Sequence, residues 1–296
     1  MGKLYPSVLI RSNEDHRLSI ILNLTQNLLN MRLQELVEDS YSLIESQYYQ
    51  MEIVNNMSAS FIYMTPNRGQ FSIAFQALID EIDRFSQFGI TESELEREKA
   101  NVKAQFLRYW QNRESIESSV IANEIVNSIL TNTPFLSPEQ KYHLIFNALD
   151  TITVQEVNSV IKNHYSGRGT RLLTMTYPNS GIPSKSAIDR LWKNYRNRNL
   201  SPYQDILDNR PLFPLHLTGN RGEIMSESII SNNPTIVELM LSNGAKVIVC
   251  KTDFEKGFFN FSAISKGGLS TVDDDDYIQT VYSPVYALRS GLNGFK

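Results

Sequence analysis

Cysteine is almost absent from this sequence, which has one, Cys250, among 296 residues. A single cysteine cannot build an internal disulfide framework or a cysteine-ligated zinc site. Because Cys250 follows the apolar, strand-like run 247–249, we expect a buried small hydrophobic side chain rather than a reactive thiol. One cysteine fits a reducing or an oxidising compartment equally well.

Long apolar runs and an excess of one charge are also missing. No stretch approaches the roughly 20 apolar residues that span a bilayer, and charged residues interrupt the first thirty positions, unlike a signal peptide. The 28 basic and 32 acidic residues give a net charge of −4, whereas phosphate binding usually leaves a basic excess. The sequence therefore predicts no membrane span and no nucleic-acid partner.

Closely spaced metal ligands are lacking as well. None of the four histidines lies three or four residues from another, as a helical zinc pair requires: His16, His143, His164 and His216. We expect His143 and His164 to be surface or capping groups on helices. The four carboxylates at 273–276 suggest a calcium or magnesium loop, but acids before a helix also favour its dipole without a metal. We assign no metal ligand and no catalytic residue, and the substrate-binding residues stay unknown.

Helical periodicity dominates residues 18–178. Apolar residues at i, i+3, i+4 and i+7 predict helices over 18–36 and 71–85, and Gly89 is placed to end the second. Capping boxes beginning at Thr91, Ser137 and Thr153 predict three further helices.

Strand patterns interrupt these helices at two places. Residues 45–54 and 57–64 predict paired strands around a turn at 55–56, and 171–177 predicts another strand. Four aromatic residues on the paired strands suggest a peptide groove, although cross-strand packing is the simpler interpretation: Tyr48, Tyr49, Phe61 and Tyr63.

The character of the chain changes after residue 178. Six of the eleven prolines lie between positions 178 and 234, so we interpret 179–233 as a linker with one short helix near 187–195. Its basic patch suggests an anion site, but a solvated helix face is the simpler interpretation: Arg190, Lys193, Arg196 and Arg198.

A β-rich stretch follows at residues 234–296. Residues 235–241 and 245–250 predict a hairpin around the Asn-Gly turn at 243–244. We expect a third strand at 258–264 and a helix at 277–289. About 60 residues are few for an independent domain, so we expect a truncated start of a further repeat.

A helix junction and two shorter stretches carry a family resemblance. The junction residues are Glu81, Arg84, Gly89, Thr91, Glu94, Leu95 and Lys99. Two shorter stretches accompany the junction: residues 28–36, and the hairpin 241–247 with a small-residue turn after it at 267–270. Together these stretches resemble the pitrilysin/insulinase-type zinc metallopeptidases, which include mitochondrial processing peptidase-like proteins. A local ion pair is the simplest account of Glu81 and Arg84.

The resemblance implies an α+β metallopeptidase-repeat fold, in which helices cover one face of an antiparallel-rich sheet. Residues 1–178 would form most of the non-catalytic second domain, with its first strands missing. Residues 179–233 would be the linker, and 234–296 the start of the third domain. The chain would then be an internal fragment of a longer polypeptide.

The same resemblance implies zinc in the intact parent, peptide or protein substrates, a catalytic domain elsewhere in the polypeptide, and a location in the bacterial cell envelope or periplasm. Catalysis in the family needs His-x-x-Glu-His on one helix. That motif is absent, and 277–289, the corresponding stretch of the partial repeat, contains no histidine. We therefore expect a chamber-forming, peptide-positioning part that is inactive alone and binds no zinc. A non-enzymatic scaffold or partner subunit with the same fold is the alternative, and an unrelated helical binding protein is a third interpretation.

Overall fold

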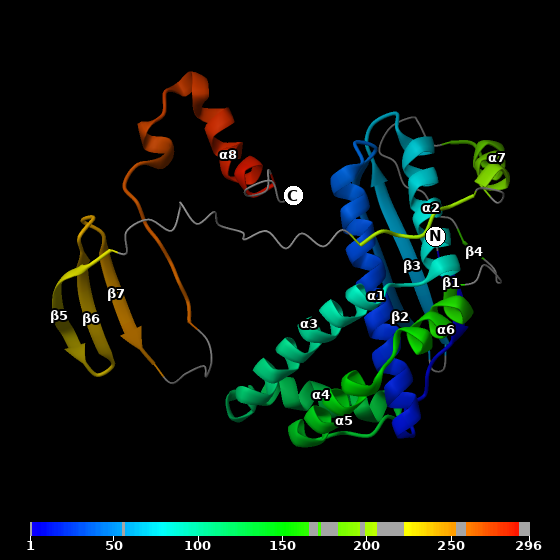
Figure 1. The fold of residues 1–296 in the computed structure, drawn as a ribbon, viewed down its shortest axis with the longest axis horizontal. Helices are drawn as coiled ribbons and strands as arrows, with labels where there is room; N and C mark the ends of the chain where they lie inside the picture. Colours follow the sequence, from blue (N-terminus) through cyan, green and yellow to red (C-terminus); the bar gives the residue numbers. More distant parts are fainter. Residues whose placement is uncertain are drawn as a thin grey trace. The chain divides into compact units, whose positions relative to one another are not determined.

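The computed structural model describes residues 2–54, 57–165, 171–172, 183–195, 199–205, 222–252 and 259–289 (Figure 1). The chain divides into two compact units, unit 1 (Met1–Asp205) and unit 2 (Ile206–Lys296). None of the described helices is both long enough and apolar enough to cross a membrane.

Unit 1 is built from a sheet and a helical layer. Its strands are β1 (Gly2–Pro6), β2 (Leu43–Val54), β3 (Met57–Pro66) and β4 (Arg171–Leu172). Its α-helices are α1 (Asn13–Asp39), α2 (Phe71–Phe88), α3 (Glu92–Gln111), α4 (Ser118–Thr131), α5 (Pro138–Thr151), α6 (Val154–Tyr165) and α7 (Lys185–Tyr195). The helices and paired strands expected from periodicity are confirmed, and β1 and α4 are elements that the sequence patterns did not predict.

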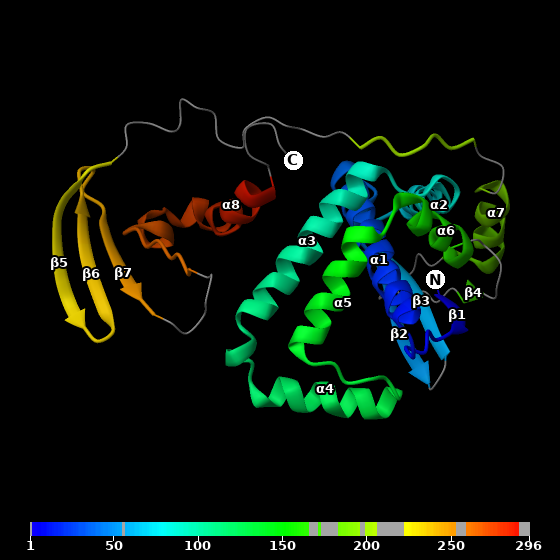
Figure 2. The same ribbon diagram turned by 60° about the horizontal axis from the view of Figure 1, so that its bottom comes forward.

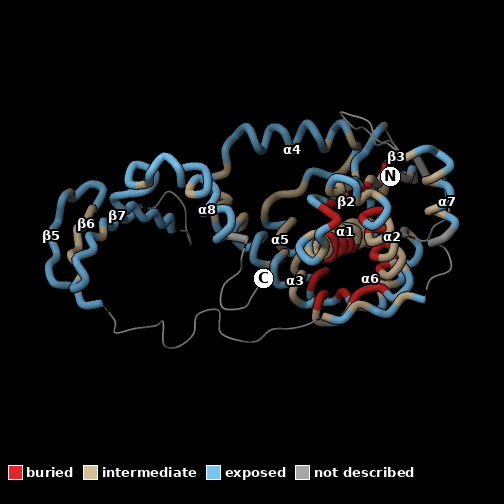
Figure 3. Tube along the Cα trace, turned by 90° about the horizontal axis from the view of Figure 1, so that it is seen from above, coloured by how far each residue is buried: buried red, intermediate tan, exposed pale blue. Residues whose placement is uncertain are grey.

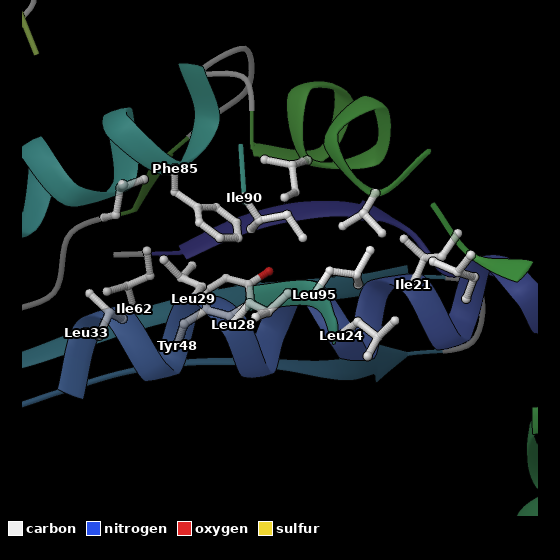
Figure 4. Close-up of a cluster of buried hydrophobic side chains, with 14 of the residues drawn as sticks. Ile21, Leu24, Leu28, Leu29, Leu33, Tyr48, Ile62, Phe85, Ile90 and Leu95 are labelled. Carbon is white, nitrogen blue, oxygen red and sulfur yellow. The ribbon is translucent and has the colours of Figure 1, made fainter. Parts of the chain in front are cut away.

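The sheet of unit 1 is antiparallel, in the order β2-β3-β1-β4. Helices α1 and α2 pack on β2 and β3, and the helices lie on one side of the sheet (Figures 1 and 2). Figure 4 shows the core between these layers, with Leu28 and Leu29 of α1 close to Tyr48 of β2 and Leu95 of α3. The α+β layering expected from the family resemblance is therefore confirmed.

Local signals fix the helix ends as expected. Thr91 and Glu94 form a reciprocal capping box at the start of α3, and Ser137 does the same with Gln140 at the start of α5. Gly89 ends α2 with φ of 70°, a left-handed conformation that favours glycine. The turn expected at 55–56, and the part of the expected strand after residue 172, lie outside the described residues.

Unit 2 contains a three-stranded antiparallel sheet in the order β5-β6-β7 and one α-helix in its described part. The elements are β5 (Ile224–Asn232), β6 (Thr235–Leu241), β7 (Lys246–Lys251) and α8 (Tyr277–Arg289). The hairpin and the helix were expected, whereas β5 lies in the stretch that we interpreted as linker.

Two expectations for unit 2 are wrong. Cys250 is exposed. It lies on β7, an edge strand of the sheet, and none of the described residues of unit 2 is buried. The expected third strand is not formed at the described positions 259–264. Strand propensity alone does not form a strand, and the described sheet of unit 2 contains only β5, β6 and β7.

Candidate functional site

The uncovered face of the unit 1 sheet carries a row of large apolar side chains. Tyr49 lies opposite Phe61 across β2 and β3, with ring centroids 5.2 Å apart and planes inclined by 20°. Tyr63 meets Tyr49 edge-on at 6.3 Å. Because side chains alternate along a strand, Met51 and, on β1, Leu4 lie on this same face. We call these five residues the open sheet face.

The structure therefore separates the four aromatic residues that the sequence grouped. Tyr48 points the other way and is 1% exposed. Its backbone N–H donates to Asn30 Oδ1 at 2.7 Å, and its hydroxyl accepts from Gln50 Nε2 at 2.7 Å. Cross-strand packing is observed for Tyr49 and Phe61, but both flank an exposed surface rather than a filled core. Contiguous exposed apolar surface of this kind marks a site of interaction.

Hydrogen bonding changes the acidity of the third ring on this face. The Tyr63 hydroxyl donates to Glu45 Oε1 at 2.5 Å and to Gln47 Oε1 at 3.2 Å. The hydrogen bond to Glu45 raises the pKa of Tyr63 above its ordinary value. Tyr63 is therefore a neutral donor at physiological pH, and the open sheet face has polar groups at one border.

The helix junction forms a buried cluster of charges centred on Arg32 of α1. The guanidinium of Arg32 donates from Nε to Glu94 Oε1 at 2.7 Å and from Nη2 to Glu94 Oε2 at 2.9 Å. Nη2 also donates to the backbone oxygen of Gly89 at 2.9 Å. Arg32 is 2% exposed and Glu94 is 0% exposed. Such bidentate pairs fix geometry as well as energy.

Glu81 is the second carboxylate of this cluster. Arg84, three residues along α2, pairs with it as the sequence spacing predicted. Arg32 Nη1 lies 3.6 Å from Glu81 Oε1, and these two buried atoms have no hydrogen-bond partner among the described residues. Burial raises the pKa of Glu81 above its ordinary value, although both arginines oppose the shift. One oxygen of the Glu81 carboxylate therefore accepts a hydrogen bond from Arg84, and the other is held near Arg32 by charge.

A short segment that we interpreted as linker closes over the cluster. We call residues 201–205 the clasp. The Tyr203 ring stacks on the Arg32 guanidinium at 4.1 Å, and its hydroxyl donates to Glu35 Oε2 at 2.7 Å. Asp205 accepts from Arg97 Nη1 at 2.6 Å. Tyr203 is half-buried, and this burial, with the bond to Glu35, raises the pKa of Tyr203.

These contacts assign a structural role to the junction motif. Lys99, 7% exposed, pairs with Glu96 at 2.7 Å, and the amide of Asn158 bonds both backbone groups of Ile90. Arg32 and Tyr203 were missed by sequence reasoning, although an arginine on the apolar stripe of the first helix was a usable signal.

A groove of about 780 Å³ lies between the start of α1 and α5, lined by Arg17 and His143 among others. Arg17 is already paired with Glu156 at 2.6 Å and with Thr151 at 2.7 Å. His143 is exposed, as expected, whereas His164 is half-buried and meets the Tyr5 ring edge-on at 4.6 Å. The ionisable residues that line the groove form no metal-holding group of three His, Cys, Asp or Glu side chains among the described residues.

The donor sets in the described part of the chain do not fit zinc. The described histidines lie on different helices, α1, α5 and α6, and His216 lies outside the described residues. No group of three His, Cys, Asp or Glu side chains that could hold a metal ion occurs among the residues described. Arg190 and Lys193 are exposed on α7, and the acidic run before α8 is also exposed; Arg196 and Arg198 lie outside the described residues.

Unit 1 thus has the fold of a sheet domain covered by helices on one side, with its buried charges used for structure. No protein-family model matches the chain. The probable zinc protease PqqL of Haemophilus influenzae is 25% identical over 265 residues, which cover 88% of this chain and 28% of that protein. PqqL of Escherichia coli K12 is 27% identical over 253 residues, 82% of this chain and 26% of that protein.

Solved structures agree with these relatives. The periplasmic protease PqqL from Escherichia coli matches with a TM-score of 0.58 at 21% identity, over 85% of this chain and 28% of that one. A predicted insulinase family protease from Yersinia pestis matches with a TM-score of 0.57 at 13% identity, over 66% of this chain and 42% of that one. At these identities the structures show the fold.

The chain is therefore similar in sequence to proteins named as zinc proteases, which bears out the resemblance that the helix junction and the two shorter stretches carry. It spans about a quarter of the length of the two curated relatives. The relatives are named as zinc proteases, which supports zinc as the metal of the longer protein.

Proposed function

We propose that this chain is a non-catalytic, chamber-forming and peptide-positioning part of a zinc-dependent metalloendopeptidase. Its catalytic domain, with His-x-x-Glu-His, would be elsewhere in the same polypeptide, and its substrates would be peptides or proteins. Because the Escherichia coli neighbour is a periplasmic protease, we place the function in the periplasm.

The open sheet face is the observation that carries the proposal. Helices cover one face of the sheet, and the other face presents apolar side chains from β1, β2 and β3. Leu4 is 62% exposed and Met51 48% exposed. An unfolded peptide offers apolar side chains in varied order, so broad apolar and aromatic contacts suit it better than one specific pocket.

A binding measurement tests the positioning role. The full chain is titrated into a fluorescein-labelled, unstructured peptide, and binding is followed by fluorescence anisotropy. Tyr49→Ala should weaken binding about tenfold, as loss of a central aromatic contact does. Phe88→Ala is a matched control, because Phe88 on α2 is 40% exposed and Tyr49 38% exposed. Equal effects of the two variants would contradict the role of the open sheet face.

A hydrolysis assay tests the non-catalytic part. The full chain is incubated with the same peptide with and without added zinc, and we expect no turnover, because the sequence lacks His-x-x-Glu-His. Zinc-dependent cleavage would contradict the proposal. A folded chain that neither binds nor cleaves the peptide would support the alternative, a scaffold or partner subunit with this fold.

A further inference from the structure

Strand β2 forms one edge of the unit 1 sheet and spans 12 residues, whereas β4, at the opposite edge, spans Arg171–Leu172. An edge strand carries a row of backbone N–H and C=O groups that face no other strand, and an extended peptide can bind such an edge as an added strand. Unit 1 therefore has two candidate places for a peptide, the open sheet face and the outer edge of β2.

The side chain of Asn30, on α1, occupies the outer edge of β2. Its Nδ2 donates to the backbone oxygen of Tyr48 at 2.8 Å, and its Oδ1 accepts from the Tyr48 N–H at 2.7 Å. In an antiparallel sheet, a residue of a neighbouring strand makes the same pair of bonds, one donated and one accepted. Asn30 therefore takes the place that a residue of an added strand would need opposite Tyr48.

Helix α1 also covers the strand around this point. Because backbone groups alternate along a strand, those of Ser46 and Gln50 point outward like those of Tyr48, whereas those of Tyr49 face Phe61 on β3. Ser46 is 8% exposed and Tyr48 1% exposed. Figure 3 shows the buried stretch of α1 inside unit 1, with β2 beside it. An added strand would meet α1 near the middle of β2, so it could not form a continuous ladder of hydrogen bonds.

We propose that the open sheet face binds peptides through their side chains alone, and that Asn30 excludes strand addition at the edge of β2. The inference rests on the proposed function and deepens it by naming the substrate class. Binding that uses no peptide N–H group also accepts peptides that cannot form a strand, including those rich in proline, which lacks this donor. The stacked rings of Tyr49 and Phe61 supply the contacts, because aromatic side chains bury a large apolar area against many partners.

Peptides with a methylated backbone test this binding mode. The full chain is titrated into fluorescein-labelled, unstructured peptides of one sequence, and binding is followed by fluorescence anisotropy. One peptide is unmodified, one is N-methylated at its odd positions and one at its even positions. An added strand turns one row of N–H groups toward the sheet edge, so one of the two methylated peptides would lose its hydrogen bonds and bind at least about tenfold more weakly.

We expect both methylated peptides to bind with dissociation constants within about threefold of that of the unmodified peptide. A larger loss for either methylated peptide would overturn the inference and keep the proposed function, because the unmodified peptide would still be bound. Failure of the unmodified peptide to bind would contradict the proposed function, and the inference with it.

Asn30→Ala tests whether Asn30 closes the edge. In the full chain labelled with ¹⁵N-tyrosine, NMR follows hydrogen exchange of the Tyr48 amide, which loses its bond to Asn30, and of the Tyr49 amide, which faces β3 and is the internal control. Exchange at Tyr48 should accelerate at least about tenfold relative to Tyr49. Asn27→Ala, at an exposed position of α1, is the matched variant and should change neither rate. An unchanged rate at Tyr48, or equal acceleration of both amides in Asn30→Ala, would overturn the role of Asn30.

Discussion

Replacing Arg32 by methionine tests whether the charged cluster holds unit 1 together. The substitution keeps the length of the side chain and removes the two bonds to Glu94, the bond to the Gly89 oxygen and the charge beside Glu81. Glu94, 0% exposed, then keeps its side-chain bonds to Thr91 alone among the described residues. Breaking a buried pair so that one charge stays uncompensated costs about 3–5 kcal/mol, and we expect this loss in the free energy of unfolding.

Arg84→Met is the matched control. Arg84 also pairs with Glu81, but its side chain is 28% exposed, so water can replace part of the interaction and the loss should be about 1 kcal/mol. Urea unfolding followed by tryptophan fluorescence measures both variants, because Trp110 and Trp192 both lie in unit 1. Equal losses for the two arginine variants would refute the reasoning.

The pH dependence of the Arg32→Met loss gives a second test. Burial raises the pKa of Glu81 in the folded chain. Protonated Glu81 therefore favours the folded state, and the free energy of unfolding falls as the pH rises through the raised pKa. Without Arg32 the pKa of Glu81 should rise further. The difference in stability between variant and wild type should therefore shrink from about pH 7 to about pH 5. A difference that widens on acidification would contradict this assignment.

Two further perturbations test the junction and its cover. Gly89→Ala should destabilise unit 1 by about 2–4 kcal/mol. The φ of Gly89 is +70°, and an added Cβ would lie 2.1 Å from the Asn158 amide oxygen. An unchanged urea midpoint would show that the backbone relaxes freely. Truncation after Asp205 should leave the tryptophan-detected unfolding of unit 1 nearly unchanged, whereas truncation after residue 181 should lower its midpoint, since it removes α7 and the Tyr203 contacts. Equal stability of the two truncated chains would exclude a role for the clasp.

Local chemistry explains which elements the sequence predicted. Capping boxes at Thr91 and Ser137, and the stop at Gly89, depend on residues three or four apart, so their spacing is visible in the chain. The Glu81–Arg84 pair is local for the same reason. The strands β2 and β3 also pair antiparallel, as their alternation indicated.

Long-range partners explain what the sequence could not show. Arg32 and Glu94 are 62 residues apart, and Tyr203 and Glu35 are 168 apart, so no spacing rule connects them. The clasp lies in a proline-rich stretch whose composition resembles a linker. Cys250 was assigned to a core because its neighbours are apolar, but an edge strand presents such residues to solvent when nothing covers it. The sequence showed the aromatic residues of the open sheet face but not which of them are exposed, because tertiary packing decides which face of the sheet the helices cover.

The clasp also sets the order in which the chain can fold during synthesis. Arg32 emerges from the ribosome long before the clasp, and the Tyr203 ring can cover its guanidinium only after residue 203 has been made. Domains generally fold as units, and contacts between distant residues close late. Unit 1 should therefore gain the stability that the clasp adds only after residues 201–205 have left the exit tunnel, later than the Arg32–Glu94 pair that lies within its first hundred residues.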